Sequence, residues 1–163
     1  MITTERLILR PRTLADIDAC IAMDCDPEVT KFIEGPWNGG VEHRAFLTER
    51  MTTAFESPLG YWAITRREAE DEFLGWVMML PEGDDIEIGW RLTRQTWGQG
   101  IATEAVRGAL MRLTEHRLKV DIIAAIHPEN TGSIRVAEKV GMGFEKEELI
   151  DGVLEKFYRL RIV

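Results

Sequence analysis

Two glycines, one residue apart between a strand-like and a helix-like run, constrain the fold of this chain most. Apolar and polar residues alternate along 86–92, as in a strand with one buried face. From Ile101 onward, apolar residues recur every four positions, which is typical of an amphipathic helix. Glycine at a helix start costs ~0.5–1 kcal/mol relative to alanine. Because bare backbone N–H groups at a helix N-terminus attract anions, Gly98 and Gly100 predict a phosphate-binding loop.

Two familiar phosphate motifs do not fit this loop. A dinucleotide fingerprint needs a glycine or alanine three residues after Gly100, where the chain has Thr103. A P-loop needs Gly-Lys-Ser or Gly-Lys-Thr, and the sequence contains neither tripeptide. The loop therefore belongs to another class of phosphate site.

The remaining patterns predict a single mixed α/β domain over residues 1–163. The expected order is β-α-α-β-β-β-α-β-α-β-β, with helices on both faces of a partly parallel sheet. We expect helices over 14–23, 41–55, 101–113 and 130–140, the first with a capping box at Thr13 and Asp16. We expect strands over 6–10, 61–65, 73–80, 86–92, 120–126, 143–149 and 153–163.

The composition of the chain indicates which classes of ligand and partner it can bind. The net charge of −8 disfavours nucleic acid and suits a cationic or amine ligand. Cys20 and Cys25 have no histidine at metal-ligand spacing, so we expect free thiols and no metal. No apolar run has the length of a signal peptide or a membrane span, which predicts a cytoplasmic protein without a membrane partner.

Three stretches resemble the GNAT N-acetyltransferases. Gln95-x-x-Gly98-x-Gly100 is similar to the pyrophosphate-binding motif of that family, and "NTGSIRVAEKVGM" (130–142) to its second signature. The segments 3–19 and 86–105 resemble in particular the ribosomal-protein N-terminal acetyltransferases. The resemblance covers nearly the whole chain, with the motifs in the expected order.

This resemblance implies a fold and a donor site. The fold is a mixed sheet of about six to seven strands that splits after residues 86–92 and 120–126, where a bulge opens a gap. The pantetheine arm of acetyl-CoA then lies along Trp90, Arg91 and Leu92 and contacts Asn130. Gln95 begins the pyrophosphate-binding motif. The pyrophosphate sits on the backbone amides of the residues that follow it, Trp97, Gly98, Gln99, Gly100, Ile101 and Ala102.

Acetyl transfer to an amine also needs a proton for the departing thiolate. Many family members supply it from a tyrosine seven positions after the signature asparagine, which here is Ala137. In the branch that this chain resembles, Ser133 is the corresponding acid. Asn130 and Ser133 equally fit the cap and first turn of a helix.

The base is open on sequence grounds. Glu87 lies on the face of its strand opposite to the apolar face, beside the expected gap. The resemblance adds Glu72 as a second candidate for the base. His43 and His127 are the other titratable candidates, and water can also mediate deprotonation. We expect Trp37 and His43 to belong to the site that binds the acceptor amine.

The sequence thus predicts an acetyl-CoA-dependent N-acetyltransferase. Its acceptor is a primary amine, on a protein N-terminus or a small molecule, that attacks directly in a ternary complex. The alternative is a CoA-binding sensor that has lost transfer. The identity of the amine stays open, as does assembly into a homodimer.

Overall fold

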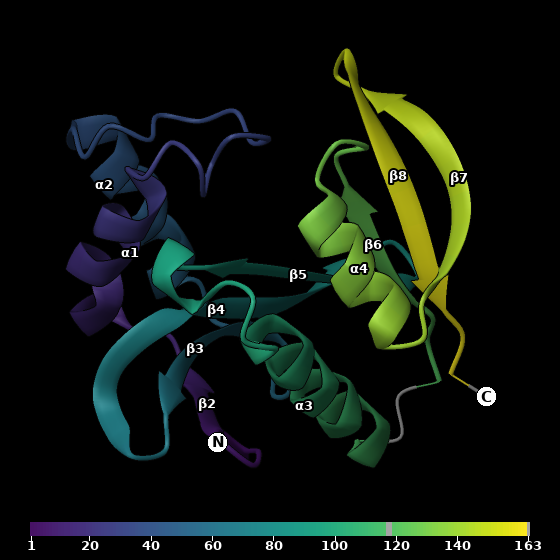
Figure 1. Cartoon of the computed structure of the whole chain (residues 1–163), viewed down its shortest axis with the longest axis horizontal. Helices are drawn as coiled ribbons and strands as arrows, with labels where there is room; N and C mark the ends of the chain where they lie inside the picture. The colour runs from purple at the N-terminus through teal and green to yellow at the C-terminus, as the bar shows by residue number, and fades with distance from the viewer. Residues whose placement is uncertain (117–118, 163) are drawn as a thin grey trace.

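One sheet organises the chain in the computed structural model, which describes residues 1–116 and 119–162 (Figure 1). Its strand order is β1-β2-β3-β4-β5-β6-β8-β7. The strands are β1 (Ile2–Thr3), β2 (Leu7–Pro11), β3 (Gly60–Arg66), β4 (Ala69–Glu82), β5 (Asp85–Leu92), β6 (Ile122–Ile126), β7 (Gly143–Ile150) and β8 (Val153–Leu160). The helices are α1 (Ile17–Asp24), α2 (Val41–Thr52), α3 (Ile101–Glu115) and α4 (Thr131–Lys139).

The order of these elements confirms the predicted one, with one addition. The sheet has eight strands within the described residues, rather than about six to seven, because β1 adds a pair of residues at the edge. Two residues are too short to give a periodic signal. The predicted strand over 153–163 ends at Leu160, and Val163 lies outside the described residues.

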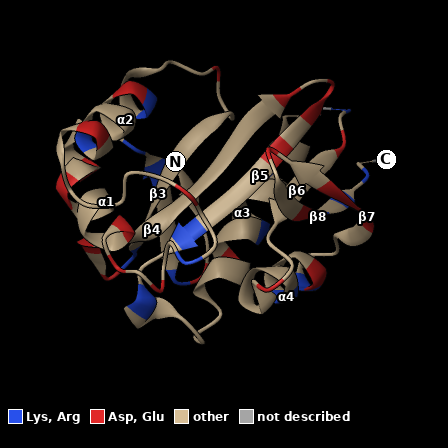
Figure 2. Ribbon diagram, turned by 90° about the horizontal axis from the view of Figure 1, so that it is seen from above, with Lys and Arg blue, Asp and Glu red and all other residues tan. Residues whose placement is uncertain are grey.

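Helices cover both faces of the sheet, as predicted (Figures 1 and 2). On one face, α3 packs against β1, β2, β4 and β5 and contacts α4. Ala105, Ala109 and Leu113 of α3 are fully buried in this main core. On the other face, α1 and α2 pack together, and α1 reaches β4. Successive residues of β5 therefore point alternately to the core and to the α1–α2 side.

The predicted split lies between β5 and β6. These parallel strands pair only at Ile86–Ile122 and Glu87–Ile123, while each continues further. On its other side β5 pairs with β4 in unbroken register up to Gly75–Leu92. The gap is confirmed, but the expected bulge is wrong at this ladder, because the divergence of β6 from β5 opens the gap.

The start of the first helical segment matches its predicted capping box. The side chain of Thr13 accepts a hydrogen bond from the N–H of Ala15, and Asp16 accepts one from the N–H of Thr13. Arg10 adds a bidentate ion pair to Asp16 at 2.7 and 2.9 Å.

Both cysteines are free thiols, and burial raises the pKa of Cys20 to about 11. In the described part of the chain, every helix is too short or too polar to cross a bilayer.

Candidate active site

The glycine loop has the backbone conformation that its sequence requires. Gly98 and Gly100 have φ of +74° and +75°, and Gly100 is the residue that precedes α3. This left-handed region costs residues with a side chain ~1–2 kcal/mol. A Cβ at Gly98 would meet no heavy atom within 4 Å, and one at Gly100 only the guanidinium of Arg6 at 3.4 Å. The two glycines therefore bend the loop and leave its outer space open.

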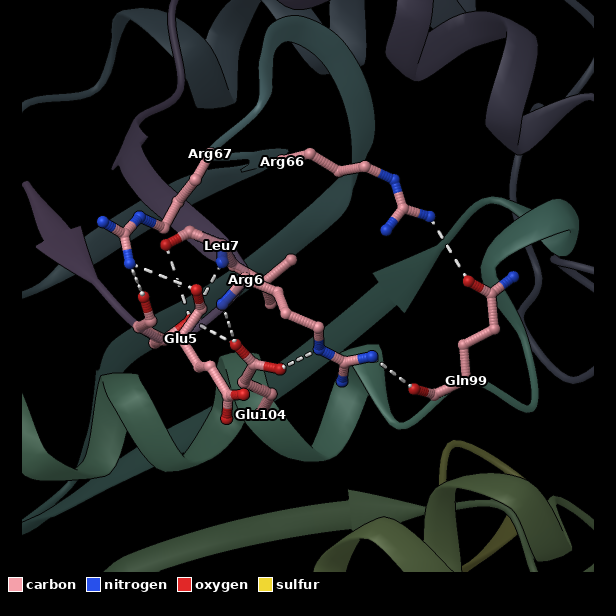
Figure 3. A network of polar contacts seen from close by, with 8 residues as sticks. Glu5, Arg6, Leu7, Arg66, Arg67, Gln99 and Glu104 are labelled. Atoms are coloured by element: carbon pink, nitrogen blue, oxygen red, sulfur yellow. Dashed lines mark hydrogen bonds and ion pairs between the residues drawn. The ribbon is translucent and has the colours of Figure 1, made fainter.

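Arg6, the residue before β2, anchors this loop from behind (Figure 3). Arg6 donates from Nη1 to the carbonyl of Gln99 at 3.0 Å and pairs with Glu104 of α3 at 2.6 Å. Because a trans peptide is planar, a Gln99 carbonyl turned toward Arg6 points the N–H of Gly100 the opposite way. The network thus orients the amides at the start of α3 away from β2.

A cavity of about 590 Å³ lies in front of these amides, between α3 and α4; we call it the donor cavity. Of the residues predicted to hold the coenzyme, it is lined by Trp90, Arg91, Leu92, Trp97, Gly98, Gly100, Ile101, Ala102 and Asn130. The side chain of Gln99 lies elsewhere: it accepts from Arg66 at 3.3 Å and donates to the carbonyl of Gln95 at 2.9 Å. The side chain of Gln99 therefore links the loop to Arg66 of β3 and to the backbone of Gln95, outside the donor cavity.

The donor cavity fits acetyl-CoA in hydrogen bonding and in charge. The N–H of Thr93 donates to Leu74 of β4, so in this antiparallel ladder Trp90 and Leu92 turn their backbone groups toward the gap. Such groups can pair with the amides of a pantetheine arm. Despite the net charge of −8, the cavity has four basic side chains against two acidic ones: Lys31, Arg91, Arg135 and Lys139 against Glu28 and Glu129. This balance favours a phosphorylated ligand.

A second cavity of about 550 Å³ lies on the α1–α2 side of the sheet; we call it the acceptor cavity. Trp90, Arg91, Asn130 and Ser133 line both cavities, so the two meet at the gap between β5 and β6. Two ligands bound on opposite sides of the gap can thus approach each other there.

Asn130 and Ser133 form the start of α4 at this junction. The side-chain oxygen of Asn130 accepts the N–H of Ser133 at 3.1 Å, which confirms its role as helix cap. Ser133 is half-buried, and its hydroxyl is available to a ligand because the cap uses only its backbone. Ala137, at the position of the missing tyrosine, is fully buried in the core.

Three carboxylates line the acceptor cavity, those of Glu34, Glu87 and Glu155. Burial raises the pKa of Glu87, and the charges of Glu82 and Glu155 raise it further. Burial likewise raises the pKa of Glu155, on β8, which sequence reasoning missed because β8 is not adjacent to β5 in sequence. Glu72 lines neither cavity; it is half-exposed and pairs with Arg66 at 3.1 Å.

His43 supports the acceptor cavity instead of lining it. It is fully buried, and its Nε2 lies 3.0 Å from Oδ2 of Asp24 while its Nδ1 accepts the N–H of Gly39. The other oxygen of Asp24 accepts from Arg91 at 2.7 Å. Trp37 lines the cavity, with the Arg91 guanidinium 4.8 Å from its ring centroid.

Arg12 also lines this cavity, and no local sequence pattern predicts it there. Its guanidinium stacks on the ring of Tyr61 at 4.0 Å, and the residue is 6% exposed. Nε and Nη2 have no hydrogen-bond partner among the described residues. Each unpaired buried polar group costs ~1–3 kcal/mol, of which the cation–π contact returns up to ~2 kcal/mol. Burial also lowers the pKa of Arg12, although arginine stays charged at any physiological pH.

Comparison with known proteins identifies the family of this chain. A family model described as an acetyltransferase (GNAT) domain matches residues 6–143. The uncharacterized N-acetyltransferase p20 of Bacillus licheniformis is 31% identical over 154 residues, which cover 90% of this chain and 83% of that protein.

Solved structures share the fold along nearly the whole chain. A GNAT-family acetyltransferase from Bacillus anthracis aligns with a TM-score of 0.83 and 27% identity, over 98% of this chain and 97% of that one. RimJ from Mycobacterium smegmatis, solved with a CoA disulfide, aligns with a TM-score of 0.75 and 22% identity, over 95% and 81%. The chain is therefore a member of the GNAT family of N-acetyltransferases, enzymes that take their acetyl group from acetyl-CoA.

Proposed function

We propose that this enzyme acetylates a primary amine held in the acceptor cavity, by direct attack on acetyl-CoA held in the donor cavity. The observation that supports direct attack is the junction of the two cavities at Trp90, Arg91, Asn130 and Ser133. The donor supplies an activated thioester carbonyl. A ternary complex needs no covalent enzyme intermediate, because the two ligands reach the gap from opposite sides.

In this proposal, the amine nitrogen attacks the thioester carbon, a C–N bond forms and the C–S bond breaks. As the amide forms, the nitrogen loses one further proton, which returns to Ser133 after Ser133 has protonated the thiolate. The amine must first be neutral, and protein α-amines have pKa values of about 7.7–8.0 against about 10.4 for lysine. Glu87 takes the proton, directly or through water, and its raised pKa makes it a better base at neutral pH. Ser133 donates a proton to the departing thiolate, and Glu155 helps to attract a cationic amine.

Replacing Glu87 by glutamine tests the base. Glu87→Gln keeps the size of the side chain but removes its charge and basicity. We expect kcat/KM at pH 7 to fall about 10²-fold or more. The loss should shrink as the pH rises, because more of the amine is then already neutral. Glu72→Gln, outside both cavities, is the matched control and should behave like the parent. If Glu72→Gln loses activity and Glu87→Gln does not, the assignment of the base is wrong.

The sensor alternative predicts a different result in the same assay. Release of CoA thiol is measured with a panel of amines that includes peptides with free N-termini, polyamines and amino acids. Turnover of any amine supports the transferase. Tight CoA binding without turnover of any amine would overturn the proposal in favour of the sensor.

A further inference from the structure

Arg12 is a buried cation in the acceptor cavity that forms no ion pair within the described part of the chain. The carboxylates of Asp24 and Asp16 act on it electrostatically, but both are already engaged, Asp16 by Arg10. One oxygen of Asp24 binds Arg91 at 2.7 Å, and the other lies 3.0 Å from His43. Two guanidinium nitrogens of Arg12 lack a hydrogen-bond partner. A guanidinium in this state is suited to bind a carboxylate, whose two oxygens match its geometry.

The opposite side of the same cavity is acidic. Glu87 lies on β5 and Glu155 on β8, whereas Arg12 stacks over Tyr61 of β3. Strand β4 lies between β3 and β5, so two strand spacings, about 10 Å, separate the lines of β3 and β5. Tyr61 and Gly89 lie in the same row across the sheet, because both pair with Met78. A Cβ at Gly89 would meet the side chain of Met78 at 2.8 Å, so Met78 covers Gly89 and forms the floor between the basic and acidic sides.

We propose that the acceptor carries a carboxylate as well as its amine, and that Arg12 binds this carboxylate while the amine lies beside Glu87. The inference rests on the proposed function, because it takes the acidic side to be where the amine reacts. Glu87 lies two residues beyond Gly89 along β5, so the span to be bridged exceeds the ~10 Å between the strand lines. An extended chain advances ~3.3–3.6 Å per residue, so the acceptor needs about three residues or more. A free α-amino acid is too short to reach both sides. The acceptor is therefore a short peptide or an ω-amino acid of similar length.

Matched pairs of acceptors test this proposal. Triglycine and 6-aminohexanoate each carry a terminal carboxylate, and their amides have the same shape without the charge. We expect the parent to use each acid with a kcat/KM at least about tenfold higher than its amide. Glycine should be a poor acceptor. The better of the two acids identifies whether the natural acceptor is peptide-like or aliphatic.

Substitution of Arg12 links the preference to this residue. Arg12→Met keeps an unbranched apolar stem and removes the guanidinium with its charge, and it should abolish the preference for acid over amide. Arg12→Lys should keep part of it, because lysine keeps the charge without the bidentate geometry. Arg44→Met removes one positive charge from an exposed pair with Asp18, outside the cavity, and should keep the full preference. A CoA-induced rise in melting temperature shows that each variant retains its donor cavity.

The outcomes separate this inference from the proposed function. If the parent uses the amides as well as the acids, or accepts only other amines, the carboxylate site is overturned and the transferase stands. If no amine is acetylated, the proposed function itself fails. Should Arg12→Met not fold, inhibition of the parent replaces it. Hexanoate should then inhibit at least about ten times more strongly than hexanamide, and equal inhibition would overturn the inference.

Discussion

Replacing Gly98 by asparagine separates the two reasons for a glycine in the loop. Asparagine tolerates the left-handed region better than other residues with a side chain, so the φ of +74° can be kept. A Cβ at Gly98 meets no heavy atom within 4 Å, so the folded chain itself should accept the change. Bound CoA should not, because the new side chain takes up space in the donor cavity. Loss of one hydrogen bond to a charged phosphate costs ~1.5–3 kcal/mol, which weakens binding about 10–150-fold.

Thermal unfolding with CoA at one hundred times the dissociation constant of the parent measures this loss. Such a concentration stabilises the parent by about 2.7 kcal/mol, or about 5–11 °C for a chain of this size. A variant that binds 100-fold more weakly keeps only about 0.4 kcal/mol. Gly152→Asn is the control: its φ is +81°, its Cβ would also meet nothing within 4 Å, and it lies in the distant β7–β8 turn. An unchanged shift in Gly98→Asn, or an equal loss in Gly152→Asn, would refute the loop as the phosphate site.

Two further substitutions test the acid and the N-terminal cap. Ser133→Ala should lower kcat about 10²–10⁴-fold while CoA affinity is retained, because Asn130 accepts its hydrogen bond from the backbone N–H of Ser133 and not from the hydroxyl. Near-normal kcat with weaker CoA binding would make Ser133 a contact instead. Asp16→Asn should lower the free energy of unfolding at pH 7 by ~1.5–3 kcal/mol. Although burial opposes its charge, the hydrogen bonds from Arg10 and Thr13 lower the pKa of Asp16 in the folded state. Its contribution is therefore present above the unfolded pKa of about 3.9 and is lost as the pH falls through the folded pKa. Urea unfolding should show parent and Asp16→Asn converging in acid, and a difference that stays constant with pH would contradict this account.

The sequence by itself determined the donor half of the site. Strand β5, the glycine loop, α3 and the cap of α4 follow one another between residues 85 and 139, so their spacing along the chain fixes their spacing in the fold. Gly98 and Gly100 were predictable because a left-handed turn before a helix needs glycine whatever surrounds it. Asn130 was predictable as a cap because capping depends on neighbouring residues only.

Only the tertiary structure decided the acceptor half. Arg12, Trp37, Glu87 and Glu155 come from separate segments that the order of the sheet brings to one cavity, and no local pattern encodes that order. For the same reason His43 could be recognised as titratable but not as the buried partner of Asp24. The pKa of Glu87 likewise depends on burial by segments remote in sequence and on a charge from β8. Short-range backbone chemistry thus specified the conformation of the glycine loop, whereas long-range packing specified which charges line the acceptor cavity.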